Sequence, residues 1–201
     1  GTDYGTIDSI NNVTFIRNGA GNSGGAIGLN YGNGVLVLGD DCKFIESYAN
    51  GRGGAICAWK NLVMGKNNFF YANEAKGSYG YGGAVFGTAG IQMGTGNVFV
   101  NNKASAGGAL WSNNKAMSGS YAIFINNTGA DGKTITIQST NIAVNFDYCY
   151  WGSNAPDFAA ISNSKKFTHN NYLVLNISAE NSNVSVGGST LITVDLTKDY
   201  Q

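Results

Sequence analysis

A short signature recurs four times along this chain, and its repetition constrains the fold more than any other feature. Each copy is Gly-Gly-Ala followed by a branched aliphatic residue, and successive copies begin 29, 29 and 25 residues apart. The copies begin at Gly24, Gly53, Gly82 and Gly107. A repeat of this length cannot bury its own apolar side chains, so its copies are expected to stack on one another as a solenoid.

A second signature, Phe-x-x-Asn, alternates with the first. It pairs Phe15 with Asn18, Phe70 with Asn73, Phe99 with Asn102 and Phe124 with Asn127, whereas Phe44 is followed three residues later by Ser47. We predict that these phenylalanines stack as a ladder inside the solenoid. The asparagine column suits a repeated tight turn, because Asn tolerates left-handed backbone and bonds to neighbouring main chain. The paired glycines allow a bend with positive φ and a close approach to the next turn.

The composition argues against a helical solenoid. Glycine supplies 30 of the 201 residues, and each glycine inside a helix costs about 1 kcal/mol relative to alanine. Apolar runs such as 35–38 and 123–125 are short and bounded by turn-forming residues, which is typical of strands. In the second repeat we expect strands at 55–57, 62–64 and 68–70, followed by a polar turn over 73–82. Residues 1–165 are therefore predicted to form an all-β, right-handed parallel β-helix of about five or six turns.

The C-terminal part of the chain has a different texture. Residues 145–156 are dense in aromatic side chains, and we expect them to form a final turn or plug that covers the end of the solenoid. Residues 166–201 are expected to hold a connector and the first strands of an immunoglobulin-like domain. This domain would be truncated, because the segment is much shorter than the ~100 residues of such a fold.

Charge, hydropathy and cysteine content argue against nucleic-acid binding, membrane spanning and metal binding. The formal net charge is zero, 12% of residues are charged and no basic run is present, so nucleic acid is not an expected partner. No apolar stretch approaches the ~20 residues needed to span a membrane. With three cysteines and one histidine in the chain, we expect no metal site and no cofactor. Cys42, two residues before Phe44 of the predicted ladder, is interpreted as a small buried apolar side chain.

The sequence also bears on the compartment. Abundant Asn, Gly, Ser, Thr and Tyr with few charges is typical of extracellular β-solenoids, so we expect the chain at the cell surface. Four Asn-x-Ser/Thr triplets are glycosylation acceptors if the protein is exported, and they begin at Asn12, Asn126, Asn176 and Asn183.

Aromatic residues recur beside the first signature. If the aliphatic residue after each Gly-Gly-Ala points inward, alternation sends the next residue outward, which places Phe86 and Trp111 on adjacent turns of one face. Trp59 and Tyr31 end the corresponding strands nearby. These four residues are the candidate ligand-binding residues, because a row of exposed rings offers a platform for sugars or for an apolar patch of a partner. The alternative is that a loop covers the rings, or that they point inward.

The two repeat signatures together resemble the repeats of chlamydial polymorphic membrane proteins. Residues 150–156 (Tyr-Trp-Gly-Ser-Asn-Ala-Pro), followed by the alternating strands of 173–194, resemble the adhesin-like surface proteins of methanogenic archaea. This resemblance implies a right-handed parallel β-helix followed by immunoglobulin-like repeats. It also implies export to the cell envelope and a role in attachment, and it brings no catalytic residues with it.

Three functions follow from these observations. We expect a monomeric, non-enzymatic cell-surface adhesin segment that presents an extended face to a glycan or protein of another organism. The second is a polysaccharide lyase or glycoside hydrolase of β-helix fold, which requires converging carboxylates. The chain has 12 of them, and Glu46 and Glu74 do not share a repeat position. Arg17 does match Glu46, which predicts an ion pair between turns. The third is a passive spacer in the cell envelope.

Overall fold

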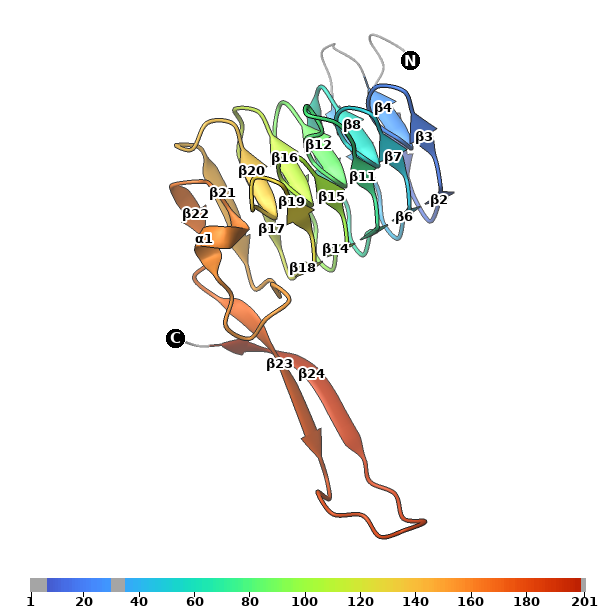
Figure 1. The fold of residues 1–201 in the computed structure, drawn as a ribbon, viewed down its shortest axis with the longest axis vertical. Helices are drawn as coiled ribbons and strands as arrows, with labels where there is room; N and C mark the ends of the chain where they lie inside the picture. Colours follow the sequence, from blue (N-terminus) through green and yellow to red (C-terminus); the bar gives the residue numbers. More distant parts are fainter. Residues whose placement is uncertain (1–6, 30–34, 200–201) are drawn as a thin grey trace.

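The chain folds into a parallel β-solenoid of about six turns (Figure 1). The computed structural model describes residues 7–29 and 35–199. Four parallel sheets, here called A to D, run along the solenoid, and successive turns of the chain add strands to each of them. The predicted parallel β-helix is therefore confirmed.

The strands of each sheet come from every fourth segment of the chain. Sheet A holds β1 (Ile7–Ile10), β5 (Val35–Leu38), β9 (Asn61–Met64), β13 (Ile91–Met93), β17 (Met117–Ser120), β21 (Ala143–Asp147) and β22 (Lys166–Thr168). Sheet B holds β2 (Thr14–Ile16), β6 (Lys43–Ile45), β10 (Phe69–Tyr71), β14 (Val98–Val100) and β18 (Ile123–Ile125). Sheet C holds β3 (Gly19–Ala20), β7 (Tyr48–Ala49), β11 (Glu74–Ala75), β15 (Lys103–Ala104) and β19 (Thr128–Gly129). Sheet D holds β4 (Ile27–Leu29), β8 (Ile56–Ala58), β12 (Val85–Gly87), β16 (Leu110–Ser112) and β20 (Ile135–Ile137).

Each complete turn has four strands, whereas the sequence predicted three. The additional strands are those of sheet C, each only two residues long. In the second repeat, strand β11 lies inside the segment 73–82 that was expected to be a polar turn. Ala75 is 3% exposed and packs inside the solenoid. A two-residue strand is too short to display an alternating pattern, so the sequence alone did not reveal it.

The predicted phenylalanine ladder is confirmed and forms the centre of the core. Consecutive rings of Phe15, Phe44, Phe70, Phe99 and Phe124 stack with centroid separations of 4.9, 4.8, 4.7 and 5.0 Å. These separations match the spacing of about 4.8 Å between neighbouring strands. The ladder therefore follows directly from the parallel register of sheet B, in which Phe44, Phe70 and Phe99 are direct partners.

The asparagine column forms a continuous hydrogen-bonded ladder. The backbone N–H of Asn73 donates to the Asn102 side-chain oxygen at 3.0 Å, and that of Asn102 donates to Asn127 at 3.1 Å. The side-chain amides of Asn73, Asn102 and Asn127 also donate to the carbonyl of a ladder phenylalanine in the turn before, as Asn102 does to Phe70 at 3.0 Å. The expected bonding to neighbouring main chain is thus confirmed.

The expectation that these asparagines themselves adopt left-handed backbone is wrong. The left-handed residue is the one before each of them, with φ of 52° to 56°, and these residues are Arg17, Glu46, Ala72, Asn101 and Asn126. This geometry reverses the chain so that the following Asn side chain points into the core and reaches the next turn. The predicted ion pair at this corner is confirmed, because Arg17 Nε lies 2.7 Å from Glu46 Oε2. Both side chains are exposed, so the pair is worth about 0–1 kcal/mol.

The two glycines of each pair serve different purposes, as expected. The first adopts φ of 63° to 69° in all four copies. The second lies against the next turn, so a Cβ at Gly54 would sit 2.1 Å from the carbonyl oxygen of Gly83. Both requirements exclude larger residues, which explains why the pair recurs in four successive turns.

Aromatic side chains close the C-terminal end of the solenoid. Trp151 stacks on Phe124 at 4.8 Å and so extends the ladder by one ring, so residues 145–156 add to the solenoid as expected. Helix α1 (Phe158–Ile161), whose N-terminus is capped by Asp157, follows this turn. Strand β22 then joins sheet A. The solenoid sheet therefore extends past residue 165, into the segment expected to be a connector.

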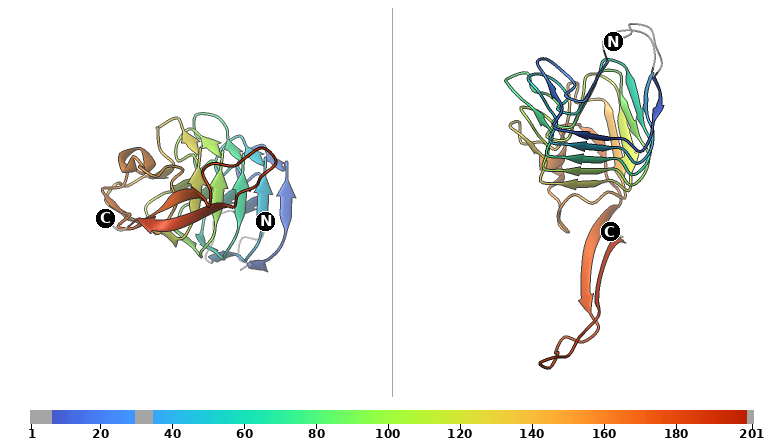
Figure 2. Two further views of the ribbon diagram at one scale, coloured as in Figure 1. Left: turned by 90° about the horizontal axis from the view of Figure 1, so that it is seen from below. Right: turned by 90° about the vertical axis from the view of Figure 1, so that its right-hand side faces the viewer.

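The described chain ends in a two-stranded antiparallel hairpin, formed by β23 (Tyr172–Ala179) and β24 (Ile192–Asp199). Figures 1 and 2 show that it extends away from the solenoid. Leu175 lies opposite Leu196, and Ile177 lies opposite Val194. Directly opposite residues share a face, so one face of the hairpin is apolar, and Ile177 and Val194 on it are 67% and 59% exposed. The expected immunoglobulin-like domain is not confirmed, because the described residues of this segment form a two-stranded antiparallel sheet.

Helix α1 has four residues. Within residues 7–29 and 35–199, no helix has the length and hydropathy needed to cross a bilayer.

Candidate functional site

The candidate site lies on the outer face of sheet D. Parallel register aligns Gly28, Cys57, Phe86, Trp111 and Thr136 along this face. Cys57, Phe86 and Trp111 form a hydrophobic cluster that is separate from the main core. The rings of Phe86 and Trp111 stack at 4.8 Å with an interplanar angle of 8°.

The prediction that this aromatic row is exposed is wrong for its central members. Phe86 is 1% exposed and Trp111 is 7% exposed. The turns that precede the glycine pairs bring Arg52 and Tyr81 over sheet D, where Tyr81 stacks on Trp111 at 5.1 Å. Trp59 meets Phe86 edge to face at 5.4 Å. The covering turn that the sequence analysis left as an alternative is therefore present.

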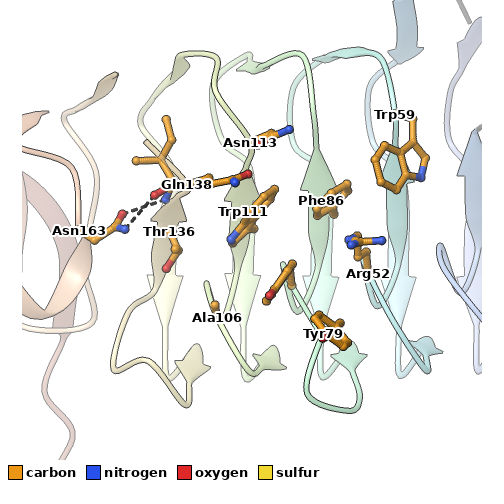
Figure 3. A pocket seen from close by; sticks show the side chains of 12 residues that line it. Arg52, Trp59, Tyr79, Phe86, Ala106, Trp111, Asn113, Thr136, Gln138 and Asn163 are labelled. Atoms are coloured by element: carbon orange, nitrogen blue, oxygen red, sulfur yellow. Dashed lines mark hydrogen bonds between the residues drawn. The ribbon is translucent and has the colours of Figure 1, made fainter. Parts of the chain in front are cut away.

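These covering side chains leave a groove of about 550 Å³ between them (Figure 3). Phe86 and Trp111 lie on the strands below it, while Arg52 and Trp59 stand at one end. Tyr81, stacked on Trp111, also lines the groove. Tyr79, which is 68% exposed, extends the aromatic wall outward. The remaining lining residues, from the later turns, are Ala106, Asn113, Thr136, Ile137, Gln138 and Asn163.

Amide side chains line the other end of the groove. Asn163 is fixed by two hydrogen bonds of 2.8 Å, one from the backbone N–H of Ile137 and one to its carbonyl. The Oδ1 atom of Asn113 is buried and has no hydrogen-bond partner among the described residues. An unpaired buried acceptor of this kind costs about 1–3 kcal/mol.

The charge in the groove comes from Arg52. Its guanidinium lies 5.1, 5.5 and 5.8 Å from the ring centroids of Trp59, Phe86 and Tyr81, which are cation–π distances. None of the twelve lining residues is Asp or Glu. A carboxylate contacts the lining residue Thr136 from outside the groove: Asp131 accepts hydrogen bonds from the Thr136 hydroxyl and from the backbone N–H of Lys133.

Cys57 lies beside Phe86 on the neighbouring strand of sheet D, and its side chain is buried. Burial raises its pKa to about 12, and the hydrogen bond with Ser23 and the positive charge of Arg52 offset that rise only in part. Cys149, in the last turn, has its pKa raised to about 12 by the same cause. Since the thiolate is the reactive form, these cysteines are suited to packing rather than to nucleophilic chemistry. Cys42, Cys57 and Cys149 are all buried and free.

We therefore expect the native protein to resist alkylation at its cysteines. At about pH 8 a thiol with a pKa near 12 is ionised to only about one part in 10⁴, and burial also blocks the reagent. Mass spectrometry after brief iodoacetamide treatment should show no label at Cys57 and Cys149, whereas the same treatment in concentrated guanidinium chloride should label both. Rapid labelling of native Cys57 would contradict its burial beside Phe86.

A second hollow of about 480 Å³ lies along sheet A, on a different sheet of the solenoid. It is lined by Met93, Ser118, Gly119, Ser120, Tyr121, Asn145, Asp147 and Tyr148. It carries one carboxylate, Asp147, whereas hydrolysis of a glycosidic bond uses a pair of them about 5–9.5 Å apart. In the part of the chain that the structure describes, no group of three or more His, Cys, Asp or Glu residues could hold a metal ion.

The structure brings together three of the four residues that the sequence predicted to bind a ligand. Trp59, Phe86 and Trp111 lie together at the groove, whereas Tyr31 falls outside the described residues. The four glycosylation candidates all have exposed side chains, at Asn12, Asn126, Asn176 and Asn183. The Asn176 amide donates to Asp195 and Thr197 of the partner strand.

Sequence reasoning missed Arg52 and the amide end of the groove. A signal for Arg52 was present, because it immediately precedes a glycine pair, at the position that Tyr81 and Ala106 occupy in the next two repeats. The glycine pair turns the chain sharply, so this preceding position lies beside the outward column of sheet D. Asn113 and Asn163 follow no repeat signature, and only the stacked turns bring them to the groove.

In comparisons with protein-family models, with curated proteins and with solved structures, no match to this chain was found. The resemblance to adhesin-like surface proteins therefore remains a prediction from the repeat signatures and from residues 150–156 and 173–194.

Proposed function

We propose that this chain is a non-enzymatic segment of a cell-surface adhesin, which attaches to a glycan or protein on the surface of another organism. The observation that carries the proposal is the groove on sheet D. Five aromatic side chains converge there with one arginine and three amide side chains. Apolar and aromatic walls with a few oriented polar groups are typical of binding sites.

Binding fits this groove better than cleavage does. A glycoside hydrolase of either stereochemical class needs a general acid and a second carboxylate, and the groove lining contains neither Asp nor Glu. Asp131, the carboxylate that contacts the lining from outside, is already bonded to Thr136 and Lys133. The rival polysaccharide lyase or hydrolase function has no comparable feature in its favour.

The attachment proposal predicts loss of binding when the accessible rings of the groove are removed. We expect the double variant Trp59→Ala, Tyr81→Ala to bind cells and glycan arrays at least about tenfold more weakly than the unmodified protein, because aromatic anchors dominate binding energies. Tyr121→Ala is the matched control, since Tyr121 is an exposed ring stacked on Tyr148 beside the other hollow. Thermal unfolding of each variant reports whether the fold is retained.

Each outcome of this experiment separates the rival functions. Binding that survives in the double variant would place the attachment face elsewhere on the solenoid. Failure of the unmodified protein to bind any cell or glycan would favour the passive spacer. Release of reducing or unsaturated sugar from a polysaccharide mixture would overturn the non-enzymatic assignment.

The proposal extends to features that the resemblance implies. We propose that the solenoid is right-handed, that the protein is monomeric and that it lies outside the cell, where the exposed Asn-x-Ser/Thr triplets are accessible for glycosylation. We also propose that the hairpin β23–β24 belongs to an immunoglobulin-like domain. Its exposed apolar face supports this, because an isolated two-stranded hairpin is marginally stable unless that face is covered.

A further inference from the structure

Arg52 is held in place by its own backbone. Its N–H donates to the Ser23 hydroxyl at 3.4 Å, and its carbonyl accepts the N–H of Gly24 at 2.9 Å. Gly53 follows with a φ of +63°. The two backbone bonds tie Arg52 to the preceding turn of the solenoid, and the sharp bend at Gly53 directs its side chain over the rings of the groove (Figure 3). The position of the guanidinium is thus set by the repeat architecture.

This guanidinium has no anionic partner within residues 7–29 and 35–199. The ion pairs found there join Arg17 to Glu46 and Lys103 to Glu74. Arg52 contacts the rings of Trp59, Tyr81 and Phe86 instead. A guanidinium has five N–H donors around its edge and no acceptor, and contact with ring faces leaves those donors free to bond. The groove is therefore locally cationic, although the whole chain has a formal net charge of zero.

Amide side chains line the groove beyond Arg52. They are Asn113, Gln138 and Asn163, which come from later turns of the solenoid. Asn113 follows β16 and Arg52 precedes β8, so these two residues lie two turns apart along the solenoid, which corresponds to about 10 Å. A ligand that occupies the groove and pairs with Arg52 must carry a negative group, polar groups that suit the amides and an apolar surface that lies against the rings.

We propose that this groove binds an anionic saccharide, whose carboxylate or sulfate group pairs with Arg52. The inference rests on the proposed attachment function and specifies its ligand class. Arginine forms paired, charge-assisted hydrogen bonds with planar carboxylates and with other oxyanions. The aromatic and amide groups recur from turn to turn along the axis, which suits an extended chain of repeating sugar units.

Isothermal titration calorimetry with defined saccharides tests this proposal. The probes are hexagalacturonate, its carboxyl-reduced neutral counterpart, a hexasaccharide of neutral sugars that carries sulfate groups, and hexaglutamate. We expect at least one acidic saccharide to bind about tenfold or more tightly than the neutral one, and we expect this preference to diminish as the salt concentration rises. The carboxylate and sulfate probes identify which anion is preferred, and hexaglutamate distinguishes a saccharide from an acidic peptide.

Substitution of the two arginines of the chain supplies the matched comparison. Arg52→Gln should abolish the preference for the acidic saccharide, whereas Arg17→Gln, which removes the same charge from an exposed side chain outside the groove, should preserve it. Arg52→Lys retains the charge and should preserve part of the preference. Thermal unfolding establishes that each variant is folded.

The outcomes separate this inference from the function on which it rests. Equal binding of acidic and neutral saccharides, an unchanged preference in folded Arg52→Gln, or tighter binding of hexaglutamate would each overturn the anionic-saccharide assignment and leave attachment intact. If the unmodified protein binds neither cells nor glycans in the attachment assay, the proposed function itself is overturned.

Discussion

Replacing Phe99 with alanine is expected to lower the free energy of unfolding by about 3–5 kcal/mol. Phe99 is 0% exposed and stacks between Phe70 at 4.7 Å and Phe124 at 5.0 Å. Truncation removes a ring from the middle of the ladder, and the neighbouring rings cannot close the gap because their own turns hold them in register. Equilibrium unfolding in denaturant, followed by circular dichroism, measures the change.

Phe69→Ala is the matched control for this substitution. Phe69 precedes ladder residue Phe70 on the same strand, but its side chain lies on the outer face, partly buried and 6.1 Å from the ring of Tyr71. We expect the Phe69→Ala substitution to lower the free energy of unfolding by only about 1 kcal/mol. Since each turn of a solenoid contacts only its neighbours, the Phe99 variant should also unfold over a broader range of denaturant. Equal destabilisation by the two variants would contradict the ladder as the centre of the core.

The asparagine ladder should be the second most sensitive feature, with Asn102→Ala lowering the free energy of unfolding by about 2–4 kcal/mol. The Oδ1 atom of Asn102 accepts hydrogen bonds from the backbone N–H and the side-chain amide of Asn73, and its own amide donates to Phe70 and Asn127. Its removal leaves the buried Asn73 N–H without an acceptor, which costs about 1–3 kcal/mol, and the other lost bonds add about 1 kcal/mol.

The chain contains a natural counterpart to this experiment at Ser47. This residue occupies the same column and is 0% exposed, and its hydroxyl oxygen has no hydrogen-bond partner among the described residues. By repetition of the ladder geometry, Ser47→Asn would donate to the Phe15 carbonyl and accept from the Asn18 N–H. We expect it to raise the free energy of unfolding by about 1 kcal/mol. A neutral Asn102→Ala together with a destabilising Ser47→Asn would show that the ladder contributes little to stability.

The predictable part of the fold was the part that the repeat encodes locally. The regular spacing of the phenylalanines was enough to predict the ladder. The ion pair between Arg17 and Glu46 was predictable because each residue lies two positions after a ladder phenylalanine. The glycine pairs indicated both the bends and the close contacts. The left-handed corner residues were misplaced by one position, because residues as different as Ala72 and Glu46 adopt that conformation and their identities carry no turn signal.

At the site, alternation in the sequence determined which residues leave sheet D on its outer side, and the repeat determined that Phe86 and Trp111 are neighbours. Both follow from strand geometry and register, which depend on residues close to each other in the repeat. Only the tertiary structure decided that these rings are covered, that Arg52 and Tyr81 cover them, and that Asn113 and Asn163 complete a groove. The physical reason is that burial and electrostatic environment arise from side chains of different turns, which stacking brings together across 25 or more residues of chain.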